Sequence, residues 1–166
     1  MQIQDFFIDL NHTNSAVEQK YDLESEFWSL FENSLIPKGK VAAVVSLEPQ
    51  ADFFELRILI NGVVQIPCDR CLDDVDIRVE RQDYFIVKLA DADDYDDDTI
   101  YINRNDGMLD IASLIYEAAA LSLPMEIKHP EGQCNPEMME ILKQHSVGND
   151  IDSTDPRWEE LQKFIQ

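Results

Sequence analysis

The stretch VAAVVSLEPQADFFELRILI, residues 41–60, decides the fold of this 166-residue chain. Every second residue is apolar from Val41 to Leu47, and the same alternation runs from Phe54 to Ile60. A period of two predicts strands with one buried and one exposed face. Because the turn residues 48–52 separate the two runs, the stretch predicts a β-hairpin.

The flanking sequence adds further strands and then helices. Strands are expected at 3–8, 75–80 and 84–89, with a bend of the chain at Asn61-Gly62. Residues 17–31 leave strand and helix both open. Asp106 or Asp110 can cap a helix that Pro124 ends, and further helices are expected at 136–145 and from Asp155.

These elements predict a single α+β domain over residues 1–166. Its first part, 1–104, is expected to be an antiparallel β meander or partial barrel, and its second part, 105–166, helical. Residues 91–98 contain six aspartates, which predicts a solvated, mobile loop. A second mobile loop is expected near 146–155.

Composition limits the compartment and the partners. The net charge of −21 predicts a field that repels phosphate and attracts basic proteins. The first residues lack the features of a secretory signal, and no apolar run is long enough to cross a membrane. With only three cysteines, an odd number, we expect a cytoplasmic protein with reduced thiols.

The motif Cys68-Asp69-Arg70-Cys71-Leu72 joins two of the expected strands. A spacing of two residues lets both thiolates reach one tetrahedral ion, as in half of a structural zinc site. Cys134 and His129 offer two further ligands, which makes Cys₃His zinc binding one interpretation. The alternative is that the thiols are packing residues and that no cofactor is bound. A redox role is not expected, since the acidic neighbours should raise the pKa of the thiols.

Arginines gather around this motif. Residues 57–88 contain Lys88 and four arginines against six acids, so this segment is nearly neutral in a very acidic chain. These arginines are candidates for partner binding, including RNA phosphate; they are Arg57, Arg70, Arg78 and Arg81. For Arg70, an ion pair that stiffens the turn is the favoured interpretation.

Sequence motifs of enzymes are absent. The chain has no phosphate-binding glycine loop, no G-x-S-x-G and no H-E-x-x-H. Glu117, near the apolar face of a predicted helix, is interpreted as a partnered structural carboxylate. We therefore expect a non-catalytic protein without a small-molecule substrate.

The order of these motifs resembles the bacterial YceD-like family. The resemblance rests on Cys68-Asp69-Arg70-Cys71-Leu72, on Leu121-Ser122-Leu123-Pro124 with Cys134 downstream, and on Asp155-Pro156-Arg157-Trp158. It implies a role in 23S ribosomal RNA accumulation and large-subunit assembly, with Cys68, Arg70, Cys71 and Cys134 as motif residues. Many members have more cysteines in the distal loop, so His129 would replace one here.

Two hypotheses follow for the function. The first is a factor for 23S RNA processing or stability, with ribosomal RNA as its partner. The second is an acidic module that escorts a basic ribosomal protein, in which case its effect on RNA is indirect.

Overall fold

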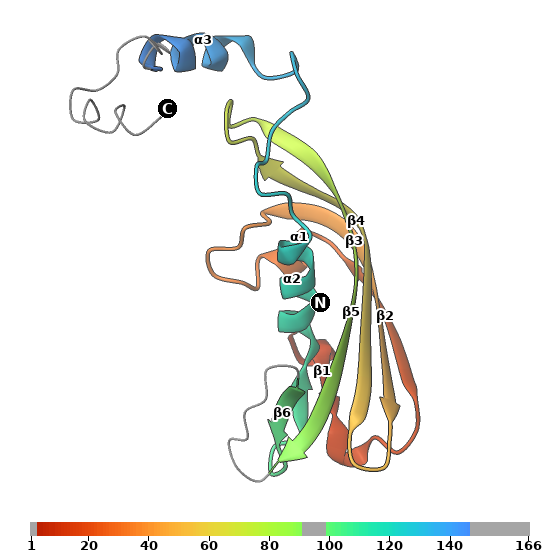
Figure 1. The fold of residues 1–166 in the computed structure, drawn as a ribbon. Coiled ribbons are helices and arrows are strands. Elements are labelled where there is room, and N and C mark those ends of the chain that lie inside the picture. The colour runs from red at the N-terminus through yellow and green to blue at the C-terminus, as the bar shows by residue number, and fades with distance from the viewer. Residues whose placement is uncertain (1–2, 91–98, 147–166) are drawn as a thin grey trace, which may run out of the picture.

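The computed structural model describes residues 3–90 and 99–146, and its centre is one curved, open β-sheet (Figure 1). The sheet has five strands in the order β2-β3-β4-β5-β6. They are β2 (Val17–Leu23), β3 (Lys38–Pro49), β4 (Phe54–Pro67), β5 (Asp74–Ala90) and β6 (Thr99–Asn103). Strands β2 to β5 form an antiparallel meander, and β6 pairs with β5 in parallel. The α+β class and the antiparallel hairpin are thus confirmed, while the sheet does not close into a barrel.

Short elements and helices complete the fold. The chain opens with the 3₁₀-helix η1 (Ile3–Phe6), strand β1 (Phe7–Asp9) and the 3₁₀-helix η2 (Leu10–His12). β1 pairs with β7 (Met108–Asp110) in a separate two-stranded sheet. The α-helices are α1 (Ser25–Trp28), α2 (Ile111–Leu121) and α3 (Pro136–His145).

The main core lies on the concave face of the large sheet. Strand β4 alternates strictly, so that Leu56, Ile58 and Ile60 are buried while the residues between them are exposed. Ile111 and Ile115 of α2 pack into the same cluster. Asp110 caps α2 by accepting a hydrogen bond from the Ser113 backbone N–H at 3.3 Å. Of the two residues predicted as caps, Asp106 and Asp110, the structure therefore uses Asp110.

The predicted bend at Asn61-Gly62 is wrong, because Gly62 lies inside β4 opposite Val41. A Cβ atom at Gly62 would lie 2.3 Å from the Lys40 carbonyl oxygen and 2.6 Å from Val41 Cα. Glycine is therefore needed for the close approach of two strands rather than for a turn.

Several other boundaries differ from the sequence predictions. The strands expected at 75–80 and 84–89 form one continuous strand, β5. Of the opening strand expected at 3–8, only residues 7 and 8 are in a strand, because residues 3–6 form η1 and β1 runs from Phe7 to Asp9. The open alternatives for 17–31 both occur, as β2 followed by α1. The predicted loop at 91–98, the helix from Asp155 and all but the first residue of the loop at 146–155 lie outside the described residues.

Candidate metal centre

The connection between β4 and β5 holds Cys68 and Cys71 at one end of the molecule. The Leu72 N–H donates to the Cys68 carbonyl at 2.9 Å, and the Cys68 N–H donates to the Asp73 carbonyl at 2.9 Å. These bonds curl residues 68–73 into a compact loop, in which Leu72 adopts a φ of 64°. Both thiols are thereby buried, with exposures of 0% and 1%.

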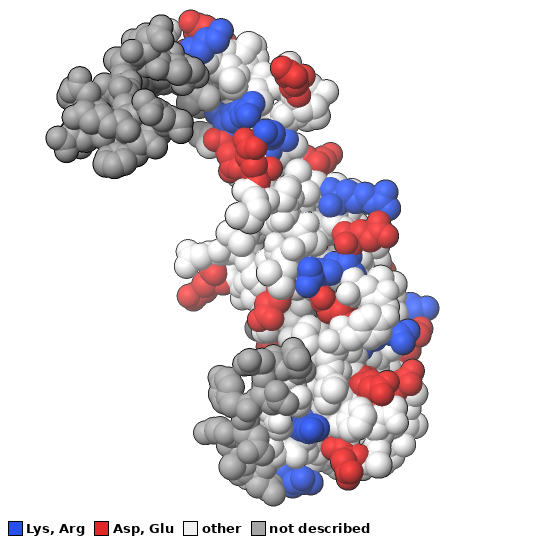
Figure 2. Space-filling model, viewed as in Figure 1, with Lys and Arg blue, Asp and Glu red and all other residues white. Residues whose placement is uncertain are grey.

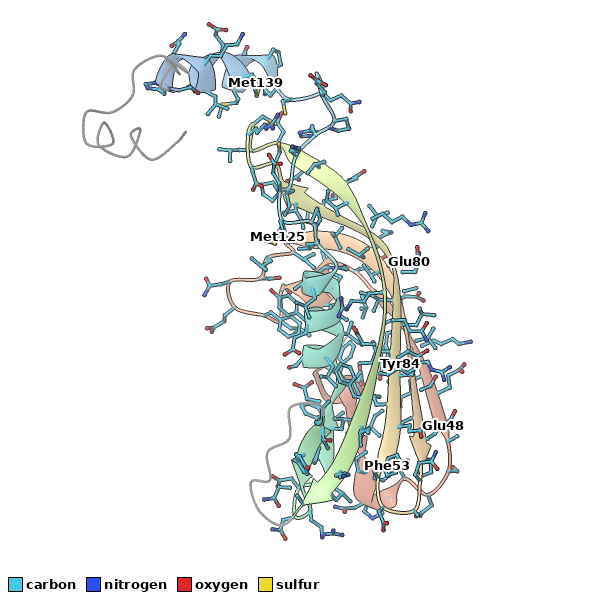
Figure 3. The ribbon with its side chains drawn as sticks, viewed as in Figure 1. Glu48, Phe53, Glu80, Tyr84, Met125 and Met139 are labelled. Atoms are coloured by element: carbon cyan, nitrogen blue, oxygen red, sulfur yellow. The ribbon has the colours of Figure 1, made fainter. Side chains whose placement is uncertain are left out.

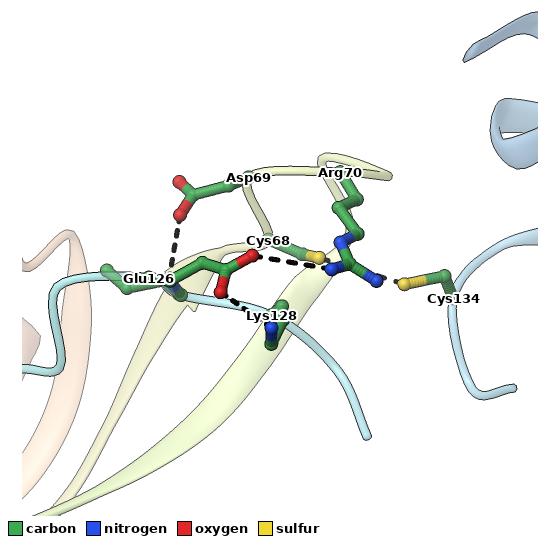
Figure 4. Close-up of polar contacts among 7 residues, drawn as sticks. Cys68, Asp69, Arg70, Glu126, Lys128 and Cys134 are labelled. Atoms are coloured by element: carbon green, nitrogen blue, oxygen red, sulfur yellow. Dashed lines mark hydrogen bonds and ion pairs between the residues drawn. The ribbon is translucent and has the colours of Figure 1, made fainter. Parts of the chain in front are cut away.

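A distant segment, residues 126–135, lies against this loop (Figure 4). Asp69 fixes it twice: its N–H donates to the Ile127 carbonyl at 2.8 Å, and its carboxylate accepts from the Ile127 N–H at 2.7 Å. Arg70 pairs with Glu126 at 3.3 Å. The Arg70 ion pair is thus present, but its partner is 56 residues further along the chain rather than in the turn itself.

The crossing of these segments brings the four predicted ligands together. The ligand atoms of Cys68, Cys71, His129 and Cys134 all lie within 4.8 Å of one another. Cys68 Sγ is 4.0 Å from Cys134 Sγ, and Cys71 Sγ is 3.3 Å from His129 Nδ1. In a tetrahedral zinc site the expected separations are about 3.8 Å between sulfurs and about 3.5 Å between sulfur and nitrogen. The arrangement therefore has the size of a four-coordinate Cys₃His site.

The imidazole of His129 is held in the orientation that such a site requires. Its Nδ1 faces Cys71, while its Nε2 lies 3.3 Å from the Asp74 carbonyl oxygen. An N–H at Nε2 can donate to this carbonyl, which leaves the lone pair on Nδ1 for a metal. A histidine that binds a metal commonly donates its other ring N–H to a backbone carbonyl in this way.

Hydrogen bonds and burial also shift the pKa values of the thiols. Burial opposes ionisation of Cys68, but backbone N–H groups of Cys71, Arg70 and His129 outweigh it, and the pKa of Cys68 falls to about 6. Burial, followed by the neighbouring Cys68 and Cys71, raises the pKa of Cys134. The expectation that acidic neighbours raise the pKa therefore fails for Cys68, because N–H donors at short range outweigh carboxylates exposed to water.

The four candidate arginines do not form one surface. Arg57 and Arg78 lie on the exposed face of the sheet, on β4 and β5, whereas Arg81 is on the opposite face. Each has a partner within the chain: Arg57 stacks on Tyr84 at 5.2 Å, Arg78 pairs with Glu80, and Arg81 pairs with Asp83 at 2.7 Å. Figure 2 shows basic and acidic side chains interleaved along the visible face rather than a basic patch.

Glu117 and its surroundings were not identified as a site from the sequence. Glu117 is exposed and lines a pocket of about 640 Å³ together with residues of β3, β4, β5 and β6. The predicted partner of its carboxylate is not found among residues 3–90 and 99–146. Only the strand register could have revealed this pocket, because its lining comes from five separate elements.

Comparisons with known proteins give one match. Residues 56–165 match the family described as "Large ribosomal RNA subunit accumulation protein YceD". No curated protein and no solved structure matches the chain. Within the described part of the chain, no helix has the length and apolar character to cross a membrane. The matched range contains all four clustered ligand residues and covers most of the sequence, so the chain belongs to the YceD family.

Proposed function

We propose that this protein is a cytoplasmic, non-enzymatic factor that supports accumulation of 23S ribosomal RNA and assembly of the large ribosomal subunit. The observation that carries the proposal is the family match over residues 56–165, whose description names large-subunit ribosomal RNA accumulation. The absence of enzyme motifs from the sequence agrees with a binding role.

In this proposal Cys68, Cys71, His129 and Cys134 hold a structural zinc ion. Thiolate and imidazole ligands suit zinc, and four protein ligands leave no open position for substrate or water. Such an ion would join the β4–β5 connection to the segment before α3. It would thus set the position of α3, in which no residue is buried.

A second candidate role is that of an acidic module that binds a basic ribosomal protein. The observation that favours it is the engagement of Arg57, Arg70, Arg78 and Arg81 by carboxylates or a ring of the same chain. Cations already paired in this way attract phosphate weakly, while the net charge of −21 attracts basic proteins. Both roles can serve large-subunit assembly.

Depletion of the protein in growing cells tests the first role. We expect 23S RNA to decrease relative to 16S RNA and to recover when the wild-type gene is restored. Unchanged 23S RNA after complete depletion would overturn the proposal.

The mode of action is tested with purified components. Direct contact with several RNA phosphates predicts binding to 23S fragments that weakens steeply as salt is raised. Capture of basic ribosomal proteins that persists after nuclease treatment, without salt-sensitive RNA binding, would establish the second role.

A further inference from the structure

Helix α3 has an apolar face that the described residues leave open. Ile141 and Leu142 lie three and four residues after Met138, so the three side chains share one side of the helix. Met138 packs in part at the candidate metal centre, whereas Ile141 and Leu142 are 50% and 42% exposed. Figure 3 shows the helix, with Met139 labelled, beyond the end of the large sheet. Within residues 3–90 and 99–146, α3 is therefore held at its first turn and its remaining apolar side chains face solvent.

An open apolar face is unfavourable for so short a helix. Isolated helices of fewer than about 12 residues are marginal in water, and in proteins most of their stability comes from packing of the apolar side. Two half-exposed aliphatic side chains give up much of this contribution. Stable helical structure in α3 thus calls for a further element that covers Ile141 and Leu142.

The sequence that follows α3 contains a segment with a matching pattern. In residues 155–166, which lie outside the described part of the chain, Trp158, Leu161 and Ile165 recur at intervals of three and four. This spacing predicts one apolar side of a helix. The family match extends to residue 165, so the segment belongs to the same family unit as the metal ligands.

The connection between the two segments is long enough for contact. Residues 146–154 can span up to about 30 Å when extended. The ten residues of α3 extend over about 15 Å, since each residue of a helix adds about 1.5 Å. Residues 155–166 can therefore reach every part of the open face and can run in either direction along it.

Charges at the ends of the two segments favour the antiparallel direction. The first turn of α3 contains Glu137, and its last turn contains Lys143 and His145. The second segment begins with Asp155 and has Lys163 near its end. An antiparallel arrangement brings opposite charges together at both ends, whereas a parallel one brings like charges together. Two antiparallel helices joined by a loop form a common motif, the αα-hairpin.

We propose that residues 155–166 form a helix that packs antiparallel on the apolar face of α3, with Trp158 against Ile141 and Leu142. The occupant of this face is thus a segment of the same chain. Two helices of this length have too small a core to fold alone, so the pair depends on the candidate metal centre that holds the start of α3. The inference does not depend on which of the two roles proposed above is correct.

Fluorine NMR of the full-length protein, labelled with 5-fluorotryptophan, tests the proposal. The chain has two tryptophans, of which Trp28 is fully buried, and Trp158→Phe assigns the two resonances. We expect Ile141→Asp to move the Trp158 resonance most of the way to its position in urea and to leave the Trp28 resonance unchanged. Gln144→Asp introduces the same charge on the polar side of α3 and should move neither resonance.

A reciprocal measurement changes the covering segment and leaves α3 intact, so it applies even if Ile141→Asp disrupts the helix itself. Trp158→Ala should raise amide exchange in residues 136–145 by at least about tenfold, with little change in residues 41–66. Glu160→Ala, on the opposite side of the expected helix, should raise it by less than about twofold.

Several results would overturn the proposal. One is a Trp158 resonance that has its urea position in the wild-type protein or that responds equally to Ile141→Asp and Gln144→Asp. Another is equal exchange of α3 in Trp158→Ala and Glu160→Ala. Protection of α3 that rises with protein concentration would assign the face to a second copy of the chain, and protection that appears only with added basic ribosomal proteins would assign it to a partner.

Discussion

Replacement of Cys134 by alanine is expected to release residues 128–145 while the sheet stays folded. This part of the chain packs on a small cluster of Cys68, Cys71 and Val75, which is separate from the main core. Since α3 contains ten residues and buries none of them, its order depends on its attachment. An isolated helix of this length is marginal in water.

The size of the expected change in amide exchange follows from the interactions that hold residues 128–145 in place. Zinc coordination is worth about 10–16 kcal/mol in small zinc peptides at neutral pH. The hydrogen bonds that remain, such as those between Asp69 and Ile127, contribute about 1 kcal/mol each. We therefore expect amide exchange in residues 128–145 to rise by at least about tenfold, while that in residues 41–66 changes little.

Hydrogen exchange read by mass spectrometry, together with metal analysis of protein purified without chelator, provides the assay. The wild-type protein should contain about one zinc per chain, and chelation should reproduce the exchange pattern of Cys134→Ala. His145→Ala serves as the control, because His145 is exposed on α3 and outside the ligand cluster. A zinc content near zero with unchanged exchange in Cys134→Ala would refute the reasoning.

Three further predictions concern the fold and the thiols. Gly62→Ala should lower the free energy of unfolding in urea by about 1–3 kcal/mol, because the new Cβ meets backbone at 2.3 Å; equal stability to an Asn61→Ala control would contradict this. Asp110→Ala should lower the free energy of unfolding by about 1 kcal/mol, because it removes the side chain that caps α2. Asp110→Asn should keep most of this stabilisation in the same assay, since asparagine also caps helices. Cobalt(II) affinity, followed by its thiolate absorption, should fall more steeply with decreasing pH below about 6, where the Cys68 thiolate gains a proton; a constant slope would argue against the lowered pKa.

The hairpin and the clustering of the candidate metal ligands could be predicted from the sequence for a local reason. The alternation of buried and exposed residues in 54–60 reports directly on strand geometry. The spacing of Cys68 and Cys71 reports on the reach of two side chains around one point. Cys134 and His129 followed as further ligands because the chain offers no other cysteine and few histidines.

Features that depend on the pairing of distant strands could not be predicted from the sequence. Gly62 has the sequence context of a turn, and only the proximity of Val41 explains it as a crossing residue. Arg81 looks like Arg78 in the sequence, yet strand periodicity places them on opposite faces of β5. The lowered pKa of Cys68 arises from backbone N–H groups of its own loop and of the distant residue His129, which composition does not report.

Because β5 is one continuous strand, it fixes the distance between the side chains at its two ends. The Asp74 carbonyl lies beside His129 of the candidate metal centre, and Tyr84 on the same strand stacks with Arg57 roughly 30 Å away. A partner that engages both ends must therefore be elongated, or must carry two contact points at that separation. Two weak contacts at the ends of one strand would act together as a strong attachment only for a partner whose own dimensions match that separation.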